Sequence, residues 1–356
     1  MLRILSFNPG STSTKLGVFD DRICVLSHTI RHKASDFAGC DTIMDQAPIR
    51  YKTITDTLSE KGFALESFDA FVGRGGIIAP VESGVYTVNE TMLKDLRSGS
   101  ASKHASALGG IFAHELGQRY GKPAFIVDPV VVDERVKEAK LTGIPEAEKT
   151  SVFHALNQKS IAREYARKHD TRYEDCCLVV AHLGGGISVG AHSFGKVIDV
   201  NNAIDGDGPF SPERCGSIEV DKIVKMCFSG KYTEAQMHAF SSKAGGLVAY
   251  FGTSNCLDVE NMALGGDEKA QLVLKAMCYA VAKQIGAMCV ALKGKVDAII
   301  LTGGLAYGKL ITDTITEYVG FMAPVEVYPG EDELLALASG AMRVITGQEE
   351  PKEYRG

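Results

Sequence analysis

The sequence has 356 residues, of which 45% are hydrophobic and 23% charged, with 38 glycines and no tryptophan. This length allows two domains of ordinary size. The net charge of −6 argues against nucleic acid or an anionic membrane surface as partners. Nine scattered cysteines without a Cys-x-x-Cys pair indicate reduced thiols rather than disulfides or a zinc site. Because no apolar run reaches about 18 residues and no signal peptide is recognisable, we expect a cytoplasmic protein without a membrane partner.

The first predicted element is a hairpin within residues 2–20. β-forming residues flank the turn Asn8–Thr14, a pattern that predicts a strand, a tight turn and a second strand. The glycine, serines and threonines of the turn offer backbone N–H groups and hydroxyls at one point, and Lys15 adds positive charge. Such a concavity suits phosphate, although a polar hairpin tip is also common as a plain turn.

Two further strands end in polar residues. The buried strand 68–72 leads into Gly73-Arg74-Gly75-Gly76, where the glycines allow close approach and the arginine projects from the strand end. The strand 124–127 ends at Asp128, a position where α/β folds place metal or catalytic ligands. A solvent-facing arginine and a turn aspartate are the simpler alternatives.

Three helices are predicted in the first half of the chain. One covers residues 41–61, with a kink or break at Pro48. A second covers residues 105–120 and has His104 at its N-terminus, where backbone N–H groups favour an anion. A third covers residues 152–169, is capped by Thr150 or Ser151, and has His154 near its start.

The segment 178–200 repeats the strand–turn–strand–strand pattern of residues 2–30 about 175 positions later. Its turn, from His182 to Ser188, again offers glycine N–H groups and a hydroxyl. Repetition of a supersecondary unit implies two domains of similar topology. We therefore expect two phosphate-type hairpins, one in each domain, that face each other across a cleft.

The remaining sequence adds a loop and a third glycine-rich strand end. The loop 201–216 is dense in glycine, proline and acids and contains Arg214; loops of this length are often functional. A buried strand at 296–301 precedes Gly303-Gly304, which predicts a further anion or nucleotide edge. The acidic turn 329–333 then leads into a final helix over residues 334–346.

Seven motifs occur in register along the whole chain. They are Asn8-x-Gly-Ser-x-Ser-x-Lys15, Arg74-Gly-Gly76, Val127-Asp-Pro129, Phe153-His154, His182-Leu-Gly-x-Gly186, Pro212-Glu-Arg214 and Leu301-Thr-Gly-Gly304. Together they resemble the acetate/butyrate kinase family of the acetokinase–sugar kinase–Hsp70–actin superfamily. Residues 154–159, 181–192 and 205–214 resemble the butyrate kinase branch in particular.

The resemblance implies an α/β fold of two similar actin-like, ribonuclease H-like domains, with mixed sheets flanked by helices and an active site in the interdomain cleft. The first domain would comprise residues 1–149 and 334–356, and the second, nucleotide-binding domain residues 150–333. The implied reaction is reversible transfer of the ATP γ-phosphoryl group to butyrate or a branched short-chain acid, with Mg²⁺. The family also implies a homodimer or a higher homo-oligomer.

The resemblance assigns roles to residues of this chain. Arg74 and Arg214 would hold the carboxylate and the transferring phosphoryl group, with His154 as a further donor. The nucleotide and phosphate positions would be Asn8, Ser11, Ser13, Lys15, His182, Gly184, Gly185, Gly186, Gly303 and Gly304. The substrate positions would be Arg74, Gly76, His104 and Phe153, and Mg²⁺ would be held by Asp128 and Glu333, with Glu331 and Asp332 as alternatives to the latter.

Two departures from acetate kinases bear on specificity. Acetate kinases have Arg-Val-Val-His-Gly-Gly where this chain has only Arg74-Gly75-Gly76, which should enlarge the acyl pocket. They also have Asn at the position of Gly185, so a side-chain contact to phosphate is lost. The alternatives are an acetate, propionate or isobutyrate kinase, or a non-catalytic actin-like nucleotide-binding sensor, which we would expect to lack the arginines and acids.

Overall fold

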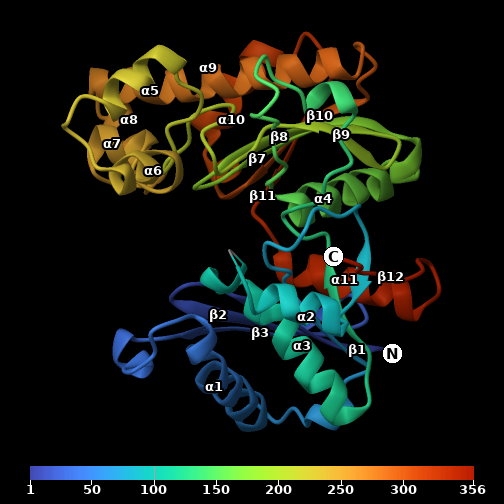
Figure 1. Cartoon of the computed structure of the whole chain (residues 1–356). Helices are drawn as coiled ribbons and strands as arrows, with labels where there is room; N and C mark the ends of the chain where they lie inside the picture. Colours follow the sequence, from blue (N-terminus) through green and yellow to red (C-terminus); the bar gives the residue numbers. More distant parts are fainter. Residues whose placement is uncertain (100) are drawn as a thin grey trace. The chain divides into compact units, whose positions relative to one another are not determined.

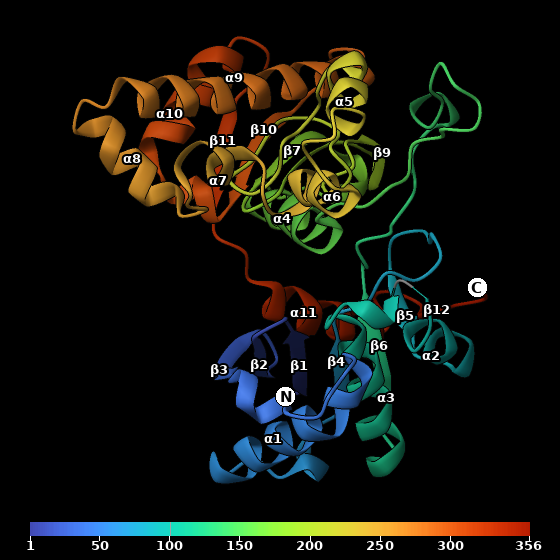
Figure 2. The same ribbon diagram turned by 60° about the vertical axis from the view of Figure 1, so that its left-hand side comes forward.

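The computed structural model describes residues 1–99 and 101–356 and divides into two compact units (Figures 1 and 2). The first comprises Met1–Val132 with Asp332–Gly356, and the second comprises Asp133–Glu331. Residues 133–149, Asp332 and Glu333 therefore group differently from the domains expected from the sequence, which divide at 149/150 and 333/334. The expected active site between the domains stays a prediction.

The first unit is built on a seven-stranded mixed sheet in the order β12-β5-β6-β4-β1-β2-β3. Strands β1, β4 and β6 are parallel, whereas β1-β2-β3 form an antiparallel meander and β5 runs antiparallel to β6. The bounds are β1 Arg3–Pro9, β2 Ser13–Asp20, β3 Ile23–Arg31, β4 Ala70–Gly73, β5 Val85–Thr87, β6 Ala124–Val127 and β12 Lys352–Glu353.

Helices cover both faces of this sheet (Figure 2). They are α1 Ala47–Glu60, α2 Glu90–Leu96, α3 Ala107–Tyr120 and α11 Glu333–Ile345, with short 3₁₀ turns at Ala34–Phe37, Met44–Gln46, Leu65–Ser67 and Ala101–Lys103. Alternate residues of β1 point to opposite faces, as the pleat requires. Leu5 and Phe7 pack with α1 and α3 residues in one core, while the other face receives α11.

The second unit repeats this plan with a five-stranded sheet in the order β11-β10-β7-β8-β9. The bounds are β7 Cys177–Leu183, β8 Ile187–Ser193, β9 Lys196–Val200, β10 Ala298–Gly303 and β11 Val325–Pro329. This order and its strand directions match β6-β4-β1-β2-β3, and the middle strand of each meander carries a register shift, at Val18/Phe19 and Ala191/His192. The internal repeat predicted from the sequence is confirmed.

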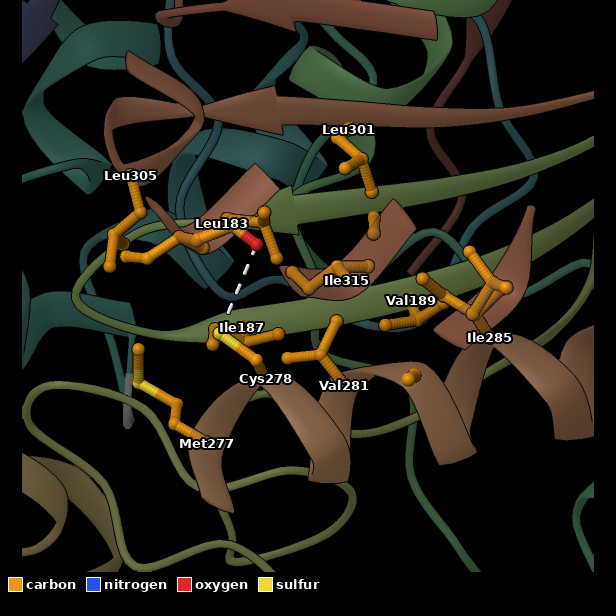
Figure 3. Packing of buried hydrophobic residues seen from close by; sticks show 14 of the residues in the cluster. Leu183, Ile187, Val189, Met277, Cys278, Val281, Ile285, Leu301, Leu305 and Ile315 are labelled. Carbon is orange, nitrogen blue, oxygen red and sulfur yellow. Dashed lines mark hydrogen bonds between the residues drawn. The ribbon is translucent and has the colours of Figure 1, made fainter. Parts of the chain in front are cut away.

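Helices also flank the second sheet. Their bounds are α4 Ala155–Lys168, α5 Val220–Cys227, α6 Glu234–Ser242, α7 Gly246–Phe251, α8 Cys256–Leu264, α9 Glu268–Ala291 and α10 Lys309–Val319, with 3₁₀ turns at Lys137–Ala139, Tyr173–Asp175 and Gly304–Tyr307. Side chains of α9, such as Val281 and Ile285, lie in one hydrophobic core with Val189 and Leu301 of the sheet (Figure 3). Helix α4 packs on the opposite face with Ala162 and Tyr165.

Helix α9 has the length and apolar composition of a membrane span. About half of its most apolar stretch is buried inside the protein. A core helix passes the same test of length and composition, so this is weak evidence for a membrane span. The packing of Met277, Val281 and Ile285 accounts for the apolar character of the helix.

Two predicted helix starts were wrong. Helix α1 begins at Ala47, so Pro48 lies in its first turn rather than at a kink; there the missing N–H costs no intrahelical bond. Helix α4 begins at Ala155 instead of 152, and neither Thr150 nor Ser151 caps it. The N-cap position is taken by His154, whose side chain makes no capping bond. The later start leaves the His154 ring available for contacts with the sheet.

Candidate active site

In the first unit, three predicted site residues lie at the carboxyl ends of neighbouring parallel strands. Asn8 lies near the end of β1, Arg74 follows β4, and Asp128 follows β6. Because β1, β4 and β6 are parallel neighbours, their carboxyl ends meet at one edge of the sheet. The structure therefore places these three residues at a common edge of the sheet, where α/β folds bind ligands.

Glu333 reaches the same edge from the first turn of α11. Its Oε1 lies 2.6 Å from Nη1 of Arg74, and its Oε2 accepts a hydrogen bond from Asn8 Nδ2. The Arg74 and Glu333 side chains are only 24% and 12% exposed. Of the three acids left open by the sequence, Glu333 is thus the one that contacts the predicted substrate arginine.

Asp128 is held in a fixed orientation. It is buried, and its backbone has a φ of 38°, in the left-handed region that aspartate tolerates better than most residues. Its Oδ1 accepts hydrogen bonds from Ser83 Oγ at 2.7 Å and from the Gly84 N–H at 2.8 Å. Over the described residues, no three His, Cys, Asp or Glu side chains group as a ready-made metal cage.

Arg50 of α1 supports the first hairpin tip from behind, a role that the sequence reasoning missed. The guanidinium is fully buried and donates to the carbonyl oxygens of Gly10 at 2.9 Å and Ser11 at 2.8 Å. Burial lowers the pKa of Arg50. The turn carbonyls thus face the interior, while the Ser11 and Lys15 side chains are exposed.

Two glycines bring α3 close to the end of β4. A Cβ at Gly73 would lie 1.9 Å from the Gly109 carbonyl oxygen, and one at Gly109 would lie 2.5 Å from that of Arg74. Gly76 is similarly close to Ala107, with 3.0 Å between its virtual Cβ and the Ala107 Cα. Helix α3 therefore packs directly on the backbone that carries Arg74 and Gly76.

His104 precedes α3. Its Nδ1 lies 2.8 Å from Ser106 Oγ. Partial burial, and then the positive charge of Arg74, lower the pKa of His104. The imidazole is therefore held in its neutral form at neutral pH, beside the predicted substrate arginine.

In the second unit, His154 and His182 form a stacked pair. Their ring centroids are 3.7 Å apart and their planes differ by 12°. His182 Nδ1 donates to Asn157 Oδ1 at 2.7 Å, and its Nε2 lies 3.6 Å from Glu331. The adjacent Phe153 is buried. The predicted histidines thus lie side by side, at the start of α4 and near the end of β7.

The glycine tip of the second hairpin is the surface on which Arg214 packs. A Cβ at Gly186 would lie 2.0 Å from Arg214 Nη1, and one at Gly185 would lie 3.1 Å from the Glu213 carboxylate. Ser211 Oγ donates to the Gly185 carbonyl oxygen at 2.5 Å. The Glu213 carboxylate therefore borders the Gly185 position, a contact that the sequence did not indicate.

The Arg214 side chain is half-buried against the tip of the second hairpin. Its Nη1 donates to the Ala203 carbonyl oxygen, and its buried Nε has no hydrogen-bond partner among the described residues. Burial lowers the pKa of Arg214, while Glu213 and Asp205 oppose this shift. An unpaired buried donor on a guanidinium is costly, and an anionic ligand oxygen would satisfy it.

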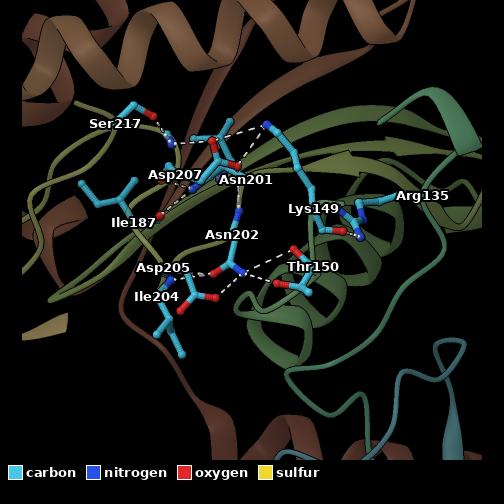
Figure 4. Close-up of polar contacts among 12 residues, drawn as sticks. Arg135, Lys149, Thr150, Ile187, Asn201, Asn202, Ile204, Asp205, Asp207 and Ser217 are labelled. Atoms are coloured by element: carbon cyan, nitrogen blue, oxygen red, sulfur yellow. Dashed lines mark hydrogen bonds and ion pairs between the residues drawn. The ribbon is translucent and has the colours of Figure 1, made fainter. Parts of the chain in front are cut away.

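Two buried asparagines fix the loop that positions Ala203 (Figure 4). Asn201 accepts the Val189 N–H at 2.8 Å, and Asn202 donates to Thr150 Oγ1 at 2.9 Å. Asn202 also donates to Asp205 at 2.9 Å. These side chains attach the loop to β8 and to the segment before α4. Their roles were not predicted, because Asn-Asn before a loop resembles ordinary turn sequence.

Gly303 and Gly304 end β10 and begin the next 3₁₀ turn. Gly303 has a φ of 90°, and a Cβ there would lie 2.4 Å from the Leu183 carbonyl oxygen. A Cβ at Gly304 would meet nothing within 4 Å among the described residues. Gly303 is therefore required by the close strand contact, whereas Gly304 borders open space that a ligand could enter.

An apolar cavity of about 980 Å³ lies elsewhere in the second unit, between α5, α6, α7 and the loop before them. Phe210, Met226 and Phe240 are among its lining residues. None of the predicted site residues lines it. The residues that line this cavity are thus different from the residues predicted to bind phosphate at the hairpin tips and strand ends.

Comparison with known proteins shows which proteins this chain resembles in sequence. A sequence model of the acetokinase family matches residues 147–324, half of the chain. The chain is 52% identical over 353 residues to butyrate kinase 2 of Clostridium acetobutylicum, and the match covers 99% of both proteins.

Solved structures show the same fold. The crystal structure of Porphyromonas gingivalis acetate kinase matches with a TM-score of 0.80 and 16% identity, over 97% of this chain and 100% of that one. A propionate kinase from Francisella tularensis subsp. tularensis SCHU S4 matches with a TM-score of 0.77 and 18% identity, over 96% and 99% of the two chains. The predicted fold class, with mixed sheets flanked by helices in two domains, is confirmed.

Proposed function

The chain belongs to the acetokinase family, and we propose that it catalyses the reversible, Mg²⁺-dependent transfer of the ATP γ-phosphoryl group to butyrate. The observation that carries this proposal is the 52% identity to a butyrate kinase over nearly the whole of both chains. The acetate and propionate kinases named above are much less similar in sequence. ATP, Mg²⁺ and a short-chain carboxylate are thus the proposed ligands.

The residues suit the chemistry of a carboxylate acceptor. A carboxylate is already ionised at neutral pH, so no general base has to activate it. The barrier arises from two anions that approach in line, with negative charge on the phosphoryl oxygens. Arg74 and Arg214 would bind the carboxylate and this phosphoryl group, since a planar guanidinium offers paired donors to such oxygens. His154 would add a further donor.

The turns of the two β-hairpins, β1–β2 and β7–β8, would provide the phosphate contacts. In the first, Arg50 draws the Gly10 and Ser11 carbonyl oxygens inward, which favours ligand contacts with the outer side of the turn. In the second, the tip glycines carry no side chains of their own, and Arg214 packs against Gly186. The proposed nucleotide and phosphate residues are Asn8, Ser11, Ser13, Lys15, His182, Gly184, Gly185, Gly186, Gly303 and Gly304, and the proposed substrate residues are Arg74, Gly76, His104 and Phe153.

Asp128 and Glu333 suit Mg²⁺ as a donor set. Mg²⁺ commonly takes one or two carboxylates and completes its shell with water and phosphate oxygens, so two acids at one sheet edge are sufficient. Asp128 is oriented by Ser83 and Gly84, and Glu333 by Arg74 and Asn8. When bound, Mg²⁺ would neutralise charge on the phosphate oxygens.

The experiment that tests the proposal is ATP-dependent acyl phosphate formation across straight C2 to C6 acids and isobutyrate, with the product trapped as the hydroxamate. We expect kcat/KM to be highest for butyrate or a branched C4 acid, because the short Arg74-Gly75-Gly76 sequence leaves a larger acyl pocket than acetate needs. A preference for acetate or propionate would assign the chain to those kinases. Absence of turnover with every acid, in a protein that binds ATP, would favour the sensor alternative.

A further inference from the structure

A continuous chain of hydrogen bonds runs from His154 into the core of the second unit. His154 Nδ1 lies 2.8 Å from Ser188 Oγ, and Gln158 Nε2 lies 2.8 Å from the same Oγ. Gln158 Oε1 lies 3.0 Å from His192 Nε2, and His192 Nδ1 lies 2.7 Å from Tyr173 Oη. Ser188, Gln158 and His192 are fully buried, and Tyr173 is nearly so.

The main chain fixes the direction of these bonds. Gln158 Nε2 also lies 3.1 Å from the Ser188 carbonyl oxygen, which can only accept a hydrogen bond. The amide nitrogen of Gln158 must therefore face Ser188, and its oxygen must face His192. A flipped amide would set two acceptors against each other on the Ser188 side.

At the inner end, this orientation determines the form of His192. Because Gln158 Oε1 accepts, His192 carries its proton on Nε2. Burial, with the charges of Lys159 and Arg163, holds the pKa of His192 well below its usual range. His192 is therefore neutral, and its Nδ1 accepts the Tyr173 hydroxyl proton.

At the outer end, the same orientation determines the direction of the Ser188 hydroxyl. Ser188 Oγ receives the Gln158 amide proton and lies 3.4 Å from the His154 backbone N–H, which is also a donor. Among these contacts, His154 Nδ1 is the one atom that can accept the Ser188 hydroxyl proton. A protonated His154 would instead set three donors against one oxygen and leave the Ser188 proton without an acceptor.

We propose that Ser188 and Gln158 are positioning residues that hold His154 in the neutral tautomer with its proton on Nε2, and that His192 and Tyr173 complete the inner end of the same chain of hydrogen bonds. This rests on the proposed function insofar as His154 donates to the transferring phosphoryl group. The neutral tautomer supplies that donor without a net positive charge beside the stacked His182 ring. A His154 protonated on Nδ1 alone would instead present a lone pair at Nε2 and repel a phosphoryl oxygen.

The two stacked histidines then have different roles. His182 donates from Nδ1 to Asn157 Oδ1, so its Nε2 is a donor only when the ring is protonated. Glu331 lies 3.6 Å from that Nε2. His154 thus donates in its neutral state, whereas donation from His182 Nε2 requires a second proton on the ring.

β8 contains a glycine that makes room for this chain. A Cβ at Gly190 would lie 2.5 Å from Gln158 Oε1 and 3.3 Å from His192 Nε2. Any larger residue would therefore displace the amide that sets the direction of the bonds. The alternation of β8 places Ser188 and Gly190 on the same face of the sheet, toward α4.

The direct test is nitrogen NMR of the imidazoles in the ligand-free full chain, with His154 assigned from a His154→Asn variant. We expect the wild-type His154 spectrum of a neutral ring protonated on Nε2. In Ser188→Ala and Gln158→Glu, the spectrum should shift toward the other tautomer or the imidazolium. Because Glu at 158 cannot donate when ionised, it would draw the Ser188 proton away from His154.

The matched control is Gln271→Glu. Gln271 likewise donates to a backbone carbonyl oxygen, that of Ala263 at 2.9 Å, but lies on the exposed side of α9. The same chemical change there should leave the His154 spectrum and the kinetics unchanged. Tyr173→Phe should alter the His192 signals and leave His154 largely as in the wild type, because the Ser188 carbonyl sets the direction independently.

Kinetics separate this inference from the proposed function. In Ser188→Ala, kcat should fall roughly tenfold with little change in the KM for butyrate, as expected from loss of about one hydrogen bond to the donor. A wild-type His154 that is protonated on Nδ1, or a spectrum unchanged in both Ser188→Ala and Gln158→Glu, overturns the inference even if the enzyme is a butyrate kinase. Loss of the proposed activity with the expected spectra would instead count against the function alone.

Discussion

The Arg74 guanidinium and the Glu333 carboxylate form an ion pair across 259 residues of sequence, with 2.6 Å between Nη1 and Oε1. Both side chains are mostly buried, so water screens the attraction between their charges only weakly. A carboxylate that orients the proposed substrate arginine and also binds Mg²⁺ would couple the two ligands. Substitution at either residue should therefore affect both carboxylate and metal dependence.

We expect Glu333→Gln to lower the free energy of unfolding by roughly 2 kcal/mol, below the cost of breaking a fully buried pair. It should also raise the Mg²⁺ concentration needed for half-maximal activity. A matched control is Glu349→Gln, which breaks the Arg343–Glu349 pair at 2.7 Å in the same unit. That variant should lose similar stability without a change in Mg²⁺ dependence. Equal metal dependence in both variants would argue against Glu333 as a ligand.

Substitution of Arg50 by Met should disorder the first hairpin tip, because it removes donors to the Gly10 and Ser11 carbonyl oxygens. We expect a loss of at least about 2 kcal/mol of stability and a raised KM for ATP. Lys52→Met on the same helix removes an exposed ion pair with Asp56 and should change neither quantity measurably. An unchanged KM for ATP in Arg50→Met would separate the turn from nucleotide binding.

Alanine substitutions at Gly186 and Gly304 should have different effects on activity and stability. Gly186→Ala places a methyl group 2.0 Å from Arg214 Nη1, so the arginine must move and kcat should fall by at least an order of magnitude. Gly304→Ala meets no described atom within 4 Å and should leave the melting temperature unchanged. If nucleotide lies beside Gly304, this variant should still raise the KM for ATP. Circular dichroism melts and steady-state kinetics measure both effects.

Buried His192 makes the stability of the second unit depend on pH. Its folded pKa is depressed, mainly by burial, so the unfolded chain binds the proton more readily. Stability is therefore present above the unfolded pKa of about 6.5 and declines below it, by up to about 1.4 kcal/mol per pH unit. His192→Gln should flatten this decline in urea melts between pH 7.5 and 5.5. His238→Gln, at an exposed position, should leave the decline as in the wild type.

The sequence predicted the elements better than the contacts between them. Strand alternation and glycine-rich turns are local patterns, and the repetition of 2–30 at 178–200 was enough to give the shared topology. The positions of Asn8, Arg74 and Asp128 at strand ends followed from the same patterns. Their common edge then required only that the strands be parallel neighbours.

Arg50 and Gln158 were missed because charge and polarity on a helix usually indicate a surface. A signal was present for Arg50, which shares a helical face with the buried Ile54 and Leu58 at four-residue spacing. No comparable signal exists for the Ser188 hydrogen bonds, since they depend on how α4 lies on β8. The ion pair between Glu333 and Arg74 likewise depends on the C-terminal segment packing back onto the first unit, which local sequence patterns do not predict.

The first unit is discontinuous, and this has a consequence for synthesis of the protein on the ribosome. Helix α11 covers one face of β1, β4 and β6. Its Gly340 packs so closely on β6 that a Cβ placed on this glycine would lie 2.6 Å from a side-chain carbon of Val127. The segment that supplies this cover emerges about 200 residues after Val132. We expect the contiguous second unit to fold while the first still has an uncovered sheet. Nascent chains are thus most exposed to aggregation, and most dependent on chaperones, before residue 345 leaves the exit tunnel.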